Sequence, residues 1–129
     1  MREARNPLLA VLVLLLAVVL AGCGLGPATD DEKVSKTAGT YLRALADGDT
    51  GTACAQLTAR ARGDTCAQAM EDRLSHLDPG ALKEAADDSM EIEVDGDRAT
   101  AGLSEPEGAR FKLVKMDDQW RIDSGYTLK

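Results

Sequence analysis

The spacing of hydrophobic and polar residues changes twice along the chain. Residues 8–21 form an unbroken apolar run. Between about residues 30 and 88, apolar residues recur every three or four positions, which is the period of an α-helix that buries one face. From Ser89 onward, apolar and polar residues alternate, as they do in β-strands with one buried side. The pattern therefore predicts an apolar leader, a helical half and a sheet half.

The helical half divides into four predicted segments. The first begins at the acidic residues 30–32 and ends at Gly48, and its apolar face holds Val34, Ala38, Tyr41, Leu42 and Leu45. A second helix is predicted from residues 49–50 to Gly63, and a third from residues 64–65 to the sequence Asp78-Pro79-Gly80. The inward residues of these two helices are Ala53, Cys54, Leu57 and Ala61, followed by Cys66, Met70, Leu74 and Leu77. A short helical turn is predicted over residues 79–86, with a proline near its start as helices tolerate.

The sheet half predicts antiparallel strands joined by turns. Asp95-Gly96-Asp97 and Met116-Asp117-Asp118 have the composition of turns, and residues 105–108 form a longer loop. The side chains predicted to face inward are Met90, Ile92, Val94, Ala99, Ala101, Leu103, Phe111, Leu113, Trp120 and Ile122. Because the helices come first and a meander of strands follows, the predicted fold class is α+β.

The apolar run at the start of the chain predicts a secretory signal. Its 14 residues are fewer than the roughly 20 that a helix needs to cross a bilayer core of about 30 Å. Arg2 and Arg5 precede the run, and small residues follow it, as in signal peptides that are later cleaved. A buried core helix and an uncleaved membrane span are the alternatives.

The sequence Leu20-Ala21-Gly22-Cys23 resembles the lipobox of bacterial lipoproteins. That resemblance implies that residues 1–22 are removed by cleavage between Gly22 and Cys23, and that Cys23 carries a covalent diacylglyceryl lipid. Residues 23–30 then form a lipidated, Gly- and Pro-containing tether, and residues 31–129 form the domain. Two acyl chains are enough for stable anchoring, so the expected location is extracytoplasmic, on the outer face of the bacterial cell membrane.

The charge of the chain argues against a nucleic-acid partner. The formal net charge is −7, and it falls to −8 without the Arg2, Glu3 and Arg5 of the leader. A strongly acidic domain is repelled by phosphate backbones and by anionic headgroups. We therefore expect the lipid alone to make the membrane attachment.

The two cysteines left after Cys23 are expected to form a disulfide. Exported proteins meet oxidising conditions, so an even pair such as Cys54 and Cys66 favours a bond. Unpaired thiols and a metal site are the alternatives. A metal site needs three or four ligands, and the chain has one histidine and no Cys-x-x-Cys, so we expect neither a metal nor a cofactor.

Several phrases in their order resemble the nuclear-transport-factor-two-like superfamily, which includes SnoaL-like proteins and ketosteroid isomerases. They are "AGTYLRALADGDTGTAC", "DTCAQAM", "IEVDGDRATAGL" and "FKLVKMDDQWRID", and the resemblance covers about residues 34–124. It implies a cystatin-like cone, in which a curved antiparallel sheet of about four strands wraps over the helices and leaves a mouth that can hold a ligand. No catalytic residue transfers by position, because the inward residues of the strands include no carboxylate or imidazole.

The leading functional hypothesis is a non-catalytic, lipid-anchored domain that binds a protein partner or a small apolar molecule in the cell envelope. Tyr41, Phe111 and Trp120 are the candidate residues to line a cavity. An isomerase- or dehydratase-like enzyme that uses Tyr41 and an acid from the first helix or a loop is one alternative, and a purely structural envelope lipoprotein is another. The sequence predicts no oligomeric state.

Overall fold

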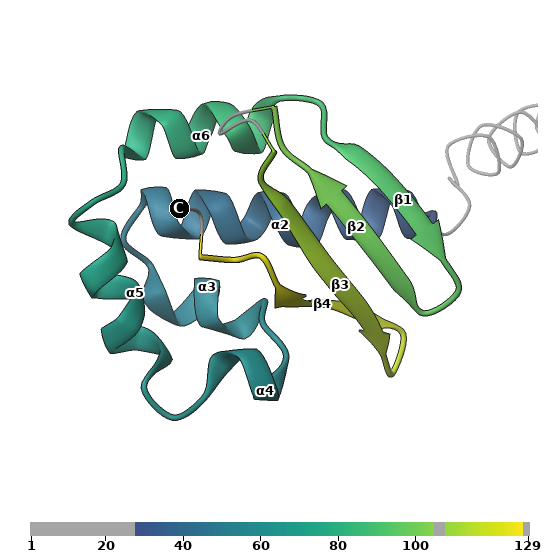
Figure 1. Ribbon diagram of the computed structural model, residues 1–129, viewed down its shortest axis with the longest axis horizontal. Coiled ribbons are helices and arrows are strands. Elements are labelled where there is room, and N and C mark those ends of the chain that lie inside the picture. Colours follow the sequence, from purple (N-terminus) through teal and green to yellow (C-terminus); the bar gives the residue numbers. More distant parts are fainter. Residues whose placement is uncertain (1–27, 105–107, 128–129) are drawn as a thin grey trace, which may run out of the picture.

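The computed structural model describes residues 28–104 and 108–127, which form five helices followed by four strands (Figure 1). The predicted signal peptide, Cys23 and the tether up to residue 27 lie outside the described residues. The helices are α2 (Asp30–Ala46), α3 (Thr50–Ala55), α4 (Ala59–Arg62), α5 (Cys66–Leu74) and α6 (Pro79–Asp87). The strands are β1 (Glu91–Asp95), β2 (Arg98–Gly102), β3 (Arg110–Met116) and β4 (Gln119–Ser124).

The first predicted helix is present as α2. Thr29 caps it by accepting a hydrogen bond from the backbone N–H of Glu32, and the acidic residues of the first turn suit the positive end of the helix. Its predicted apolar face is buried throughout. The helix ends at Ala46, and Gly48 takes a positive φ of 73° in the turn that follows.

The second predicted helix is wrong, because the chain forms two helices where one was expected. Residues 56–58 leave the helix to pair with β4: Ile122 donates its N–H to the carbonyl of Gln56 at 2.8 Å, and Thr58 donates to the carbonyl of Ile122 at 2.9 Å. Leu57 between them is buried. Thr58 then caps the new helix α4 through its side-chain oxygen.

The third predicted helix is also shorter than expected. It ends as α5 at Leu74, and residues 75–77 form a turn, with Ser75 as the C-terminal cap. Asp78 caps α6 by accepting from the N–H of Gly80, and Pro79 takes the first helical position. Helix α6 packs on α2, in agreement with the short helix predicted over residues 79–86.

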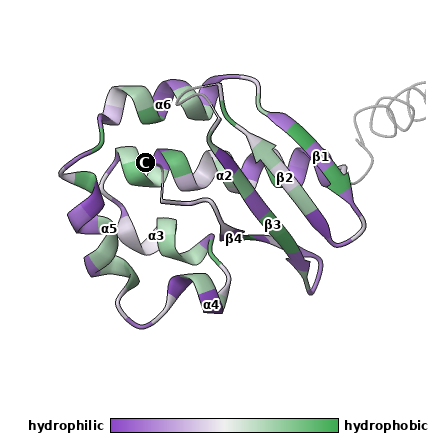
Figure 2. Ribbon diagram, in the orientation of Figure 1, coloured by the Kyte–Doolittle hydropathy of each residue, from purple (hydrophilic) through white to green (hydrophobic). Residues whose placement is uncertain are grey.

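The four strands form the predicted antiparallel meander, in the order β1-β2-β3-β4. The predicted inward residues of the last three strands, and Leu103 directly after β2, are buried: Ala99, Ala101, Leu103, Phe111, Leu113, Trp120 and Ile122. Ile92 and Val94 are only half-buried, because β1 lies at the edge of the sheet. Hydrophilic and hydrophobic residues alternate over the first four residues of β3, and Figure 2 shows both kinds on this strand.

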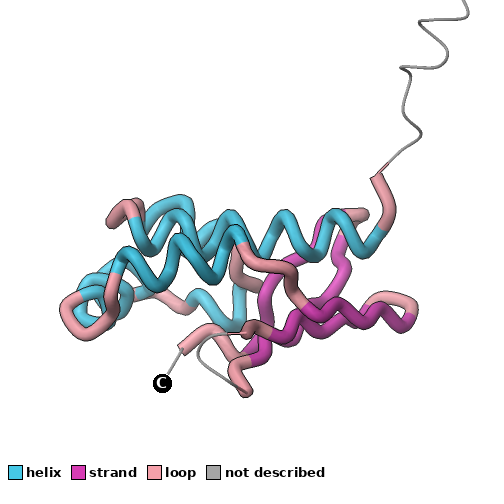
Figure 3. The backbone as a smooth tube through the Cα atoms, turned by 90° about the horizontal axis from the view of Figure 1, so that it is seen from above, coloured by secondary structure: helices cyan, strands magenta, loops and turns pink. Residues whose placement is uncertain are grey.

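The helices and the sheet form two layers, which confirms the α+β class. Seen from above, α2 runs along one side of the sheet (Figure 3), and it contacts β1, β2 and β4. The core lies between the layers, and Trp120, Tyr41, Phe111 and Leu42 are its largest fully buried side chains. In the described part of the chain, no helix has the length and apolar character that crossing a membrane requires.

Candidate functional site

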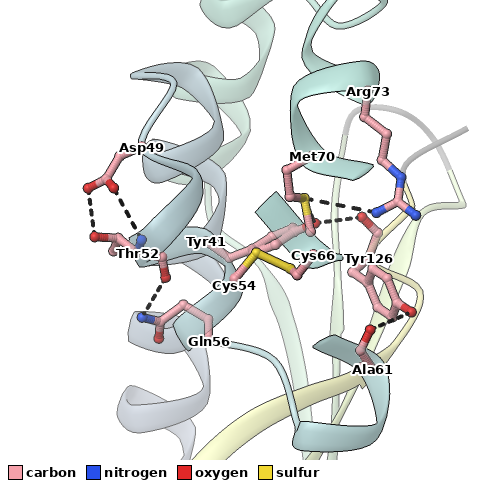
Figure 4. Close-up of a disulfide and its surroundings, with 10 residues drawn as sticks. All are labelled: Tyr41, Asp49, Thr52, Cys54, Gln56, Ala61, Cys66, Met70, Arg73 and Tyr126. Carbon is pink, nitrogen blue, oxygen red and sulfur yellow. Dashed lines mark hydrogen bonds between the residues drawn. A yellow bond between two sulfur atoms is a disulfide. The ribbon is translucent and has the colours of Figure 1, made fainter. Parts of the chain in front are cut away.

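The predicted cysteine pair forms a disulfide in the structure. Cys54 lies near the end of α3 and Cys66 begins α5, with their Cα atoms 6.1 Å apart (Figure 4). Both residues are buried. The bond therefore ties together the two helices that flank α4, on the side of the core where Tyr41 lies.

The hydroxyl of Tyr41 is used inside the protein. It donates to the backbone carbonyl of Tyr126 at 2.9 Å, and the Met70 sulfur lies 3.6 Å away. The Tyr41 ring meets Phe111 edge to face, with centroids 5.6 Å apart. Burial raises the pKa of Tyr41 above its usual value of 10.0. Tyr41 is therefore a neutral hydrogen-bond donor that joins α2 to the end of the sheet half.

Tyr126 closes the core beside Tyr41, and the sequence patterns missed it. Its hydroxyl donates to the carbonyl of Ala61 at 3.2 Å, and the Arg73 guanidinium lies 5.4 Å from its ring centroid (Figure 4). Tyr126 thus contacts α2, α4 and α5 after the last strand has ended. The one signal in the sequence that could have pointed to Tyr126 was Gly125, a glycine directly after a predicted strand.

Trp120 lies apart from the other two predicted cavity residues. Its indole Nε1 donates to Asp30 Oδ1 at 3.1 Å, and Lys115 Nζ lies 3.2 Å from the same oxygen. The Trp120 hydrogen bond, followed by the Lys115 contact, lowers the pKa of Asp30. Asp30 and Tyr41 are eleven residues apart on one helix, or about 16 Å. The structure therefore brings Tyr41 and Phe111 together and leaves Trp120 at the start of α2.

The space between the layers is filled around these three residues. Tyr41 and Phe111 are fully buried and Trp120 is 2 % exposed. Within residues 28–104 and 108–127, every buried side-chain nitrogen and oxygen has a hydrogen-bond partner. The surface hollows described below include none of the three in their walls, so their role in lining a ligand cavity stays a prediction.

A hollow of about 360 Å³ lies on the side of the sheet that faces solvent. Four residues of its wall, one from each strand, form a row across the sheet: Glu93, Thr100, Lys112 and Ser124. Asp95, Arg98 and Val114 belong to the next row of the wall. The hollow thus offers both signs of charge and two hydroxyl groups, which suits polar contacts with a partner.

Asp123 also lines this hollow and is held in place from α4. Thr58 donates its hydroxyl to one carboxylate oxygen at 2.9 Å, and Arg60 donates to the other. These two contacts, Arg60 first, lower the pKa of Asp123. The carboxylate therefore stays ionised at neutral pH and already has its partners.

The described residues bring no three His, Cys, Asp or Glu side chains together as a metal ion would require. No protein-family model, curated protein or solved structure matches the chain. The candidate site is therefore defined by its own geometry.

Proposed function

We propose that the chain is a lipid-anchored, extracytoplasmic binding domain without a catalytic role, and that its partner is a protein of the bacterial cell envelope. The partner would contact the solvent-facing side of the sheet. The observation that carries this proposal is the 360 Å³ hollow on that side, with charged and hydroxyl side chains in its wall.

The chemistry of the hollow favours a protein partner over a small apolar ligand. Small-molecule sites are mostly apolar clefts that enclose their ligand, whereas this hollow is open and carries five charged residues in its wall: Glu93, Asp95, Arg98, Lys112 and Asp123. Protein interfaces are surrounded by polar groups of this kind.

The interior offers little to a cavity enzyme. Tyr41, the residue on which the enzyme alternative depends, donates its hydroxyl to the Tyr126 carbonyl, and Phe111 packs against its ring. We propose that the sheet and helices correspond to the cone of the superfamily that the sequence resembles. Side chains would then occupy the place of a ligand.

The anchor is tested first, on the chain expressed in a bacterial host. We expect the intact mass of a chain that begins at Cys23, carries a diacylglyceryl group, and is two hydrogens lighter because of the Cys54–Cys66 bond. It should remain with membranes, whereas Cys23→Ala should not be lipidated. A wild-type chain that keeps residues 1–22 contradicts the anchor.

The binding surface is tested by photo-crosslinking in the same cells. A photoreactive amino acid replaces Thr100 in the hollow, and a control chain carries it at Glu84, which is exposed on α6. We expect a discrete protein adduct from position 100 and none from position 84. The absence of any adduct from position 100 would contradict the proposed surface.

A further inference from the structure

The register of the sheet separates the charges on its solvent-facing side. On that side β1 carries three acidic residues: Glu91, Glu93 and Asp95. Their cross-strand neighbours on β2, β3 and β4 include four basic residues: Arg98, Arg110, Lys112 and Arg121. We call these four residues the basic strip. A chain with a net charge of −7 thus presents a cationic area over three of its four strands.

Acidic neighbours balance the basic strip only at Arg98, which stands opposite Asp95 in the register of β1 and β2 and helps to lower the pKa of Asp123. Among the ion pairs of the described residues, none includes a residue of the strip. Asp123 lies beside the strip, but its two oxygens accept from Arg60 and Thr58. Arg62 of α4, which packs against β4, extends the cationic area, whereas Arg60 is ion-paired with Asp123.

A second hollow, of about 370 Å³, adjoins the strip between α4 and the end of β3. Leu57, Arg62, Met116 and Arg121 contribute to its wall. Met116 is 50 % exposed, and it is the one large hydrophobic side chain exposed in the described part of the chain. The strip thus ends at a place where an apolar side chain of a partner can be buried.

We propose that the basic strip binds an extended, acidic segment of the partner protein, with an apolar side chain of that segment in the hollow beside Met116. This inference rests on the proposed function and names the chemistry of the partner. Arg110 and Lys112 are two positions apart on β3, so they share one side of the strand at a spacing of about 7 Å. Carboxylates at every second position of an extended segment have the same spacing. Arginine and carboxylate also form strong paired hydrogen bonds.

The acidic residues of β1 favour a narrow partner. A wide, flat anionic surface such as a lipid headgroup layer would meet the β1 carboxylates together with the strip. A single extended segment can lie along β3 and β4, with β2 between it and the β1 carboxylates. The charge pattern therefore favours a protein segment over a membrane surface.

The test uses the lipidated mature chain, residues 23–129, in neutral detergent micelles. The probe is a fluorescent peptide in which Glu and Thr alternate around one Leu, and the matched peptide has Gln in place of Glu. We expect the Glu peptide to bind at least about tenfold more tightly by fluorescence anisotropy, and to weaken as salt screens the charges. Equal affinity for the two peptides would overturn the proposal.

Variants locate the binding on the strip. Arg110→Glu with Lys112→Glu should reduce affinity for the Glu peptide by about tenfold or more. The control, Lys33→Glu with Lys36→Glu, makes the same change of charge on α2 and should leave affinity unchanged. Met116→Ala should weaken binding severalfold. Circular dichroism confirms that each variant is folded, and a folded strip variant that still binds normally overturns the proposal.

Two other occupants give distinct results, and each would overturn the proposal. Headgroups on the strip would block the Glu peptide in phosphatidylglycerol bilayers but not in phosphatidylcholine bilayers. A second copy of the chain on the strip would give a dimer in the wild type and a monomer in the strip variant.

The Thr100 crosslink separates this inference from the proposed function. If the crosslink persists in the strip variant, this inference fails and the proposed function stands. If the crosslink never forms, the proposed function itself fails.

Discussion

Gly125 lies where β4 ends and the chain passes the first residues of β3. A Cβ atom at this position would sit 2.0 Å from the carbonyl oxygen of Arg110, and its φ of +84° disfavours other residues. Both constraints come from backbone atoms, which a side-chain rearrangement cannot relieve. The close approach is what brings Tyr126 over Tyr41.

Gly125→Ala should destabilise the domain by about 2–4 kcal/mol, because the strand and the Tyr126 segment must move apart. Urea denaturation followed by circular dichroism measures the change. The control is Gly48→Ala, at a φ of +73° with no atom within 4 Å of the added Cβ, which should cost only the backbone strain of about 1–2 kcal/mol. Equal losses in the two variants would show that the contact with Arg110 is unimportant.

The buried hydroxyl of Tyr41 predicts how stability depends on pH. The pKa of Tyr41 is raised in the folded state, so the unfolded chain loses this proton first as the pH rises above 10.0. Stability is therefore complete below that pH and falls above it. Tyr41→Phe should cost about 1 kcal/mol at pH 8 through the lost hydrogen bond, and it should lose less stability than the wild type between pH 9 and 11. Urea denaturation at each pH gives the free energy of unfolding. If this free energy falls equally with pH in the wild type and in Tyr41→Phe, the account of Tyr41 is wrong.

At the scale of elements, the β3–β4 hairpin turns at two aspartates, without a glycine. Asp117 and Asp118 both have positive φ, at 51° and 63°. A two-residue turn of this kind normally ends with glycine, which adopts such angles without steric cost. In the hairpin at residues 95–98, by contrast, the residue with positive φ is a glycine, since Gly96 takes a φ of +62°.

Asp118→Gly should therefore stabilise the domain by about 0.5–1 kcal/mol, because it relieves the left-handed conformation. The midpoint of thermal unfolding is the measurement. Asp117→Ala is the counterpart and should lower the midpoint, because alanine tolerates positive φ less well than aspartate. A lower midpoint for Asp118→Gly would mean that the Asp118 side chain makes a contact that stabilises the fold by more than the left-handed conformation destabilises it.

Local spacing predicted most elements and failed where a distant strand decides the outcome. Ala53, Cys54, Leu57 and Ala61 keep a helical period, so the sequence around them gives no reason to end a helix at residue 55. The break comes from Ile122, which makes both hydrogen bonds to residues 56–58. That partner lies more than 60 positions along the chain, beyond the reach of any local pattern.

In the candidate site, too, local patterns predicted some features and missed those that depend on distant parts of the chain. Alternation along the strands was enough to predict which side chains face inward, and the cysteines were enough to predict a disulfide. The basic strip depends on the register between strands and on the irregularity at Lys112 and Leu113, which a single strand pattern does not contain. Tyr126 was missed because it is a single residue after the last strand, and a periodic pattern needs several residues to be recognised.

At the scale of the whole molecule, the disulfide holds the small helices on the core. Helices α3, α4 and α5 are short, and short helices are marginal without tertiary support. The bond joins positions that are 12 residues apart in sequence, so it restricts the unfolded chain across this region.

Replacing Cys54 and Cys66 together by Ala should lower the free energy of unfolding by about 3 kcal/mol. The measurement is urea denaturation, and the wild type in a reducing agent serves as the comparison. Both should shift to lower urea by similar amounts, and the reducing agent should not affect the variant. An unchanged midpoint in the variant would mean that packing alone holds α3 to α5.

The hydrogen bond between Tyr41 and Tyr126 spans 85 positions of the chain, and that between Trp120 and Asp30 spans 90. A chain delivered through a membrane from its N-terminus releases α2 first and these partners last. During that interval α2 has an apolar face and nothing to bury it against. If the chain is exported as proposed, its core can therefore close only after nearly the whole domain has crossed, and until then the apolar face of α2 is the surface that a chaperone outside the membrane would have to protect.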